Sequence, residues 1–99
     1  MEFEKDIESY LKRRVEKELG GICFKMTGAE GVPDRVVVLP PSGRVVWVEM
    51  KRKGGRLSEM QKYQHARLRK RGAEVVVLWS RSDVDEFIDK MINDEETEH

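Results

Sequence analysis

The chain has 99 residues, one cysteine, and a formal net charge of zero from 19 basic and 19 acidic side chains. This length gives one small domain, excludes a multidomain enzyme, and favours a homodimer as a way to cover spare apolar surface. The longest apolar run, residues 75–79, is too short for a membrane span, the N-terminus lacks the apolar segment of a signal peptide, and the lone Cys23 fits a reducing cytoplasm.

The first half of the chain predicts a helix followed by three strands. Apolar residues recur at helical spacing over residues 3–19, and the pair Gly20 and Gly21 ends that helix. Short runs of β-branched residues between loops then predict the strands. These strands are expected at residues 22–26, 35–39 and 44–51. The tight turn at 40–43 joins the last two as a hairpin.

The second half predicts a helix, a strand and a helix. Ser58 and Gln61 form a capping box that opens a long helix ending at Gly72. The β-branched run 74–79 predicts a strand buried on both faces, and a second capping box at 82–85 opens the last helix. We therefore expect an α/β fold with a small mixed sheet, flanking helices and the order α-β-β-β-α-β-α. Residues 1–92 would form the single domain, and 93–99 an acidic disordered tail.

Charge is balanced overall but segregated along the chain. Residues 1–50 carry a net charge of −1, residues 51–72 a net charge of +8, and residues 73–99 a net charge of −7. The basic block could bind phosphates, because it would release counterions from a nucleic-acid backbone. It could equally be a solvated helix face that pairs with the acidic C-terminal third.

The predicted hairpin brings two carboxylates together. A four-residue turn places Leu39 opposite Arg44, so Asp34 falls opposite Glu49 on the same face, with Cβ atoms about 5 Å apart. Lys51 points the same way, beside Glu49. Mg²⁺ prefers such oxygen ligands, and a nearby lysine can orient water or stabilise charge during phosphodiester hydrolysis. The alternative is a surface salt bridge among these three side chains.

These residues resemble a known nuclease motif. Pro33 and Asp34, followed by Glu49, Met50 and Lys51, resemble the PD-(D/E)XK signature. The surrounding segments are similar to the VRR-NUC branch of that superfamily, which implies a restriction-endonuclease-like core. They lie at residues 20–25, 31–35, 43–51 and 57–61.

The resemblance implies roles for individual residues. Asp34 and Glu49 would bind a divalent metal with the Met50 carbonyl as a further ligand, and Lys51 would be the catalytic lysine. Gln61 would lie beside the site, although its place in the capping box explains it as well.

The family also has a glutamate of the first helix at the metal site. Glu8 is preferred to Glu4 because it lies deeper in the apolar stripe and at the better distance from Gly20. Candidate DNA contacts are the cations near these motifs, which are Lys25, Arg35, Arg52, Lys53, Arg56 and Lys62.

The resemblance implies a DNA endonuclease that uses Mg²⁺ or Mn²⁺ and no organic cofactor. Stand-alone members, found largely in phages and bacteria, are similar to junction-resolving nucleases, so branched DNA such as a Holliday junction and a homodimer are expected. The alternatives are a non-catalytic DNA-binding module and a nuclease for flaps, nicks or RNA.

Cys23 and His65 are expected to be structural and not zinc ligands. Trp47 and Trp79 are expected in the core or a dimer interface, which would lie around Trp79, Phe87 and Ile88 or along the first helix.

Overall fold

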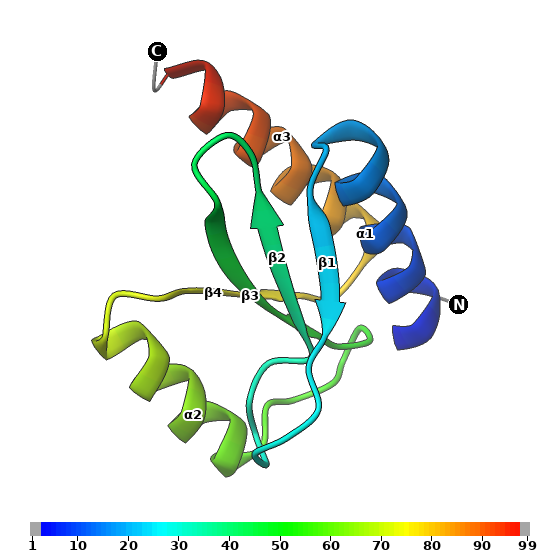
Figure 1. The fold of residues 1–99 in the computed structure, drawn as a ribbon. Coiled ribbons are helices and arrows are strands. Elements are labelled where there is room, and N and C mark those ends of the chain that lie inside the picture. The colour runs from blue at the N-terminus through cyan, green and yellow to red at the C-terminus, as the bar shows by residue number, and fades with distance from the viewer. Residues whose placement is uncertain (1–2, 98–99) are drawn as a thin grey trace.

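The computed structural model describes residues 3–97, which form a four-stranded mixed sheet and three helices (Figure 1). The elements are α1 (Glu4–Glu18), β1 (Ile22–Lys25), β2 (Arg35–Leu39), β3 (Arg44–Met50), α2 (Glu59–Lys70), β4 (Glu74–Leu78) and α3 (Arg81–Thr97). Strands β1, β2 and β3 are antiparallel neighbours, and β4 joins the edge of β3 in parallel. The predicted fold class and element order are confirmed. No helix in the described part of the chain is long and apolar enough to cross a membrane.

The strand register agrees with the hairpin prediction. Leu39 pairs with Arg44 and Arg35 pairs with Val48, as a four-residue turn requires. Alternation along β3 then divides its side chains between the two faces of the sheet. Val48 is buried on the core face, whereas Trp47 and Glu49 lie on the other face.

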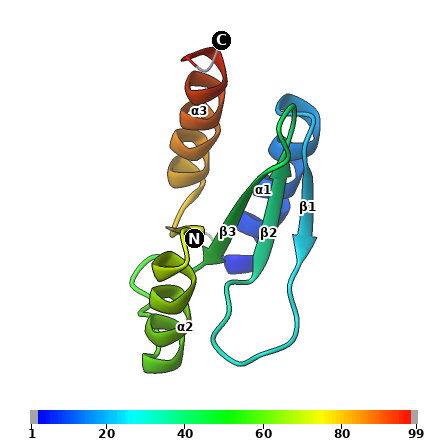
Figure 2. The same ribbon diagram turned by 60° about the vertical axis from the view of Figure 1, so that its left-hand side comes forward.

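Helices α1 and α3 cover the core face of the sheet. Ile7, Leu11 and Val15 of α1 are fully buried there, together with Val84 and Ile88 of α3. Figures 1 and 2 show α2 and the loop 26–34 at one end of the molecule, with the β2–β3 turn and the last turns of α3 at the other. This arrangement leaves the opposite sheet face to α2 alone, which packs against β4.

The structure corrects the predicted start of the last helix. Helix α3 begins at Arg81, because the Ser80 hydroxyl accepts a hydrogen bond from Asp83 N at 3.0 Å. The Asp83 carboxylate in turn accepts from Trp79 N at 2.7 Å. The predicted capping box beginning at Ser82 is therefore wrong by two residues.

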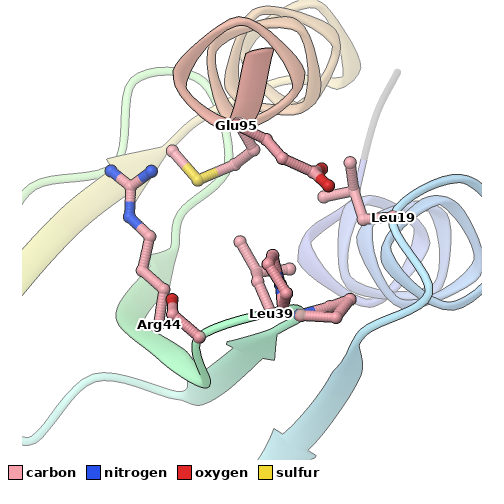
Figure 3. A pocket seen from close by; sticks show the side chains of 8 residues that line it. Leu19, Leu39, Arg44 and Glu95 are labelled. Atoms are coloured by element: carbon pink, nitrogen blue, oxygen red, sulfur yellow. The ribbon is translucent and has the colours of Figure 1, made fainter. Parts of the chain in front are cut away.

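The acidic tail is also shorter than predicted. Residues 93–97 continue α3, so their predicted disorder is wrong, and residues 98–99 lie outside the described part. Asp94 accepts hydrogen bonds from Arg44 at 2.9 Å and from Lys90 at 3.0 Å, which ties this turn to the sheet. Glu95 and Arg44 also line a pocket of about 20 Å³ beside Leu39 (Figure 3). This pocket has room for about one water molecule, so it is no substrate site.

Two further expectations about apolar surface are wrong. Phe87 and Ile88 are buried in the core with the apolar face of α1, so neither they nor that face can form a dimer interface. Strand β4 was expected to be buried on both faces, but it is an edge strand whose Val76 and Val77 are only half-buried. The reason is that β4 has a neighbouring strand on only one side.

Candidate active site

The two predicted carboxylates meet at one end of the hairpin. Asp34 directly precedes β2, and its Oδ2 accepts a hydrogen bond from Met50 N at 2.9 Å. The side chains of Asp34 and Glu49 are within hydrogen-bonding reach of each other. Glu49 is 1% exposed, so the alternative of a solvated surface salt bridge does not fit this site.

Helix α2 holds the Glu49 carboxylate from above the sheet. Gln61 Nε2 donates to Glu49 Oε2 at 3.4 Å, and His65 Nε2 lies 3.1 Å from Glu49 Oε1. Gln61 also completes the predicted capping box, since its Oε1 accepts from Ser58 N at 2.8 Å and its own N donates to Ser58 Oγ at 3.1 Å. The two roles weighed for Gln61 are therefore compatible.

His65 belongs to the site, which the sequence argument did not foresee. It is the one buried side chain of α2, at 1% exposed. Burial lowers the pKa of the imidazole, and the charge of Arg69 acts in the same direction. His65 is therefore neutral near pH 7, and within residues 3–97 its Nδ1 has no hydrogen-bond partner. The sequence does contain one signal that His65 lies at the site. Gln61 and His65 are four residues apart on the predicted helix, so both face the same way.

The electrostatics of the site favour a cation. Burial raises the pKa of Glu49 to about 8, and the hydrogen bond and charge of Asp34 add to this rise. Lys51 opposes the rise, whereas the carboxylate of Glu4 adds to it. Two adjacent carboxylates repel each other when both are ionised, and a positive ion bound by both would offset this repulsion.

The first helix presents its two candidate glutamates differently. Glu8 Oε2 lies 3.6 Å from an Arg35 guanidinium nitrogen, on the core side of the sheet. Glu4, one turn closer to the N-terminus, is among the charges that act on Glu49. This placement favours Glu4 over Glu8 as the helical carboxylate nearest the site, the reverse of the preference drawn from the sequence.

The donor set suits a hard divalent cation. Asp34 and Glu49 supply carboxylate oxygens, which Mg²⁺ and Mn²⁺ prefer, and Mg²⁺ commonly keeps several waters beside one or two carboxylates. Among residues 3–97, no three Asp, Glu, His or Cys side chains converge as a metal site. The remaining positions would therefore fall to water, a substrate phosphate, or a backbone oxygen such as that of Met50.

A close backbone contact positions the loop that carries Asp34. Gly31 has a φ of +87°, and a Cβ at this residue would lie 2.6 Å from the Met60 carbonyl oxygen of α2. Gln64 Nε2 also donates to Glu30 O at 3.2 Å. The loop is therefore fixed on the helix that holds Glu49, and a side chain at residue 31 would displace it.

The candidate DNA contacts divide into exposed and paired cations. Those exposed and without a described ion pair are Lys25, Arg52, Lys53 and Arg56. Arg35 faces Glu8, and Lys62 Nζ lies 3.2 Å from Glu59. The three exposed cations of the loop after β3 stand closest in sequence to Lys51, so they are the stronger candidates for phosphate contacts.

A pH-dependent loss of stability is expected in the metal-free protein. Between about pH 4.5 and pH 8, folded Glu49 holds a proton that the unfolded chain has released, so the free energy of unfolding falls as pH rises. The expected loss in the free energy of unfolding by pH 8 is on the order of 2–4 kcal/mol. Glu49→Gln should remove this loss, because glutamine does not titrate. Urea unfolding in EDTA from pH 5 to 8.5 measures it, with Glu59→Gln on the exposed start of α2 as the control. Equal slopes for wild type and Glu49→Gln would contradict the assignment.

Comparison with known proteins agrees with this fold. The family model described as VRR-NUC domain matches residues 2–82. Over 80 residues the chain is 42% identical to "Putative nuclease p44" of Acyrthosiphon pisum secondary endosymbiont phage 1, covering 79% of this chain and 84% of that protein. A solved structure named "VRR_NUC domain" is similar with a TM-score of 0.80 and 38% identity, covering 87% of this chain and 94% of that one.

Proposed function

The chain belongs to the VRR-NUC family of nucleases, and we propose that it is a Mg²⁺- or Mn²⁺-dependent DNA endonuclease that acts on branched DNA. The observation that carries the proposal is the buried Glu49 carboxylate beside Asp34, with Lys51 two residues further along the chain. A module that only bound DNA would gain nothing from two carboxylates that repel both each other and phosphate.

Each residue of the site has a separate task in this proposal. Asp34 and Glu49 hold the metal, and Gln61 and His65 orient Glu49. A divalent metal held there would supply a water of lowered pKa and would neutralise negative charge on the phosphate. Lys51 orients the attacking water or donates to a non-bridging phosphate oxygen as charge develops there.

Cleavage of labelled DNA tests the proposal directly. Four-way, flap and linear duplex substrates are incubated with the protein in Mg²⁺, in Mn²⁺ and in EDTA. We expect cleavage that needs the metal and favours the four-way junction. Binding of DNA without cleavage in either metal would favour a non-catalytic module, and equal cleavage of linear duplex would remove the preference for branches.

An uncovered apolar face supports a homodimer as the active assembly. Ile22, Phe24 and Val45 are 50%, 54% and 43% exposed, and the strand pairing places them on the sheet face that also carries Glu49. Resolving a junction needs paired cuts in two strands, and one chain of this length holds a single site. Two copies joined through this face would bring two sites into one particle.

Phe24→Glu should convert the dimer to a monomer without unfolding the chain, because the side chain is exposed and a charge at an apolar interface is costly. Sedimentation equilibrium across the concentrations used for junction cleavage measures the assembly. Phe3→Glu, an equally drastic change at a residue 50% exposed elsewhere, is the matched control and should stay dimeric. A wild-type monomer that cuts both opposing strands in one binding event would refute the dimer.

A further inference from the structure

Trp79 lies next to the proposed catalytic lysine, although it was expected in the core or a dimer interface. Lys51 directly follows β3 and Trp79 directly follows β4, and the parallel register pairs Met50 with Leu78. Lys51 N donates to Leu78 O at 2.9 Å, which fixes the two chain segments side by side. Trp79 is 37% exposed, so a large part of this residue remains open to solvent.

The orientation of the indole is fixed by the loop after β3. Trp79 Nε1 donates to Gly55 O at 3.2 Å. Gly55 also borders the catalytic lysine, because a Cβ at this residue would lie 3.7 Å from Lys51 Cδ. The indole, the glycine and the lysine stem thus form one cluster, and the exposed cations Arg52 and Lys53 lie in the same loop.

We propose that Trp79 stacks against an unpaired nucleobase next to the phosphate that is cut. This inference rests on the proposed function and narrows its substrate class to DNA with unpaired or unstacked nucleotides at the scissile position. A phosphate held near Lys51 would place the base of its own nucleotide within reach of the neighbouring indole. Bases inside a continuous duplex have both faces covered by their neighbours, so they offer the indole nothing to stack on.

Tyr63 provides a matched comparison for this stacking role. It is more exposed than Trp79, at 58%, but the Arg67 guanidinium lies over its ring at 5.5 Å from the centroid. One face of that ring is therefore already occupied. Tyr63→Ala should leave the preference for unpaired DNA unchanged, whereas Trp79→Ala should reduce it.

Fluorescence of Trp79 reports stacking directly. Trp47→Phe leaves Trp79 as the sole tryptophan, and Asp34→Asn in the same chain prevents cleavage. This protein is titrated with single-stranded oligothymidylate, with an abasic oligomer of equal length and with a blunt duplex, while anisotropy of labelled DNA measures binding. We expect saturable quenching by oligothymidylate alone. Equal quenching by the abasic oligomer, or binding without quenching by any probe, would overturn the stacking role.

DNA cleavage by two Trp79 variants separates base stacking from the hydrogen bond between the indole and Gly55 O. In the otherwise wild-type chain, Trp79→Ala should weaken cleavage of flap and junction DNA roughly 5- to 150-fold, the loss of one stacked base. Trp79→Phe loses the hydrogen bond but keeps an aromatic face, so it should cleave nearly as wild type does. Equal losses in both variants would assign Trp79 to positioning the loop and overturn the inference. A wild-type chain that neither binds nor cleaves DNA would instead refute the proposed function, and the inference with it.

Discussion

Replacing Asp34 with asparagine is expected to abolish Mg²⁺-dependent cleavage while the fold survives or gains stability. Asparagine can still accept the hydrogen bond from Met50 N, because Oδ1 takes the place of the carboxylate oxygen. What disappears is the negative charge that we propose binds the metal and that raises the pKa of Glu49. Loss of a residue that only supports a ligand typically costs 10- to 100-fold, so loss of the ligand itself should cost more than about a hundredfold.

Calorimetric titration of Mn²⁺ into wild type and Asp34→Asn separates metal binding from folding. We expect a clear binding isotherm for wild type and none for the variant, whose melting temperature should be unchanged or higher. Asp89→Asn makes the same chemical change on the exposed side of α3 and should bind Mn²⁺ as wild type does. Equal Mn²⁺ affinity in Asp34→Asn would remove Asp34 from the metal site.

The position of Asp34 opposite Glu49 could be predicted because it depends on short-range chain geometry. A four-residue turn between Leu39 and Arg44 fixes the register of the whole hairpin, and each further pair follows by counting. The capping box of Ser58 and Gln61 is local in the same way, since it spans three residues. Local rules of this kind do not depend on how distant elements pack.

The burial of Glu49 could not be predicted, because it depends on the packing of α2 over the sheet. Only that packing brings His65 to within 3.1 Å of Glu49, sixteen residues away in the chain. The choice between Glu4 and Glu8 depended likewise on where Arg35 points. The extent of α3 was missed because Asp94 is held by Arg44, fifty residues before it, and a polar sequence without this partner reads as a tail.

The same packing explains why the site combines a buried carboxylate with an exposed edge. Glu49 is enclosed by side chains of α2, whereas Asp34, Lys51 and Trp79 lie where the strands end and the loops begin. Burial keeps the Glu49 carboxylate in one orientation, and in the proposed function the strand ends would receive the phosphate. In the proposed function, Asp34 and Glu49 would hold the metal at this junction of buried and exposed residues, and the metal would supply the charge that a DNA phosphate needs.

Replacing Lys51 with methionine should collapse turnover while DNA binding weakens only modestly. Methionine keeps most of the aliphatic stem that lies near Gly55 and loses the charge. The hydrogen bond from the backbone N of residue 51 to Leu78 O is unaffected. Binding is shared with the exposed cations Arg52, Lys53 and Arg56, so one charge fewer changes the affinity little. The reaction, in contrast, loses the cation whose charge acts on the Glu49 carboxylate.

Single-turnover cleavage with saturating protein isolates this loss from binding. A positioned acid–base or charge-stabilising group typically contributes 10²- to 10⁴-fold, so we expect a drop of about that size in the rate constant for Lys51→Met. Lys53→Met removes an exposed charge two residues further on and should weaken binding by a similar amount without changing the single-turnover rate. If Lys51→Met instead cleaves at a near-normal rate once saturated, Lys51 is a phosphate contact like its neighbours. The water would then have to be oriented by the metal and its carboxylates alone.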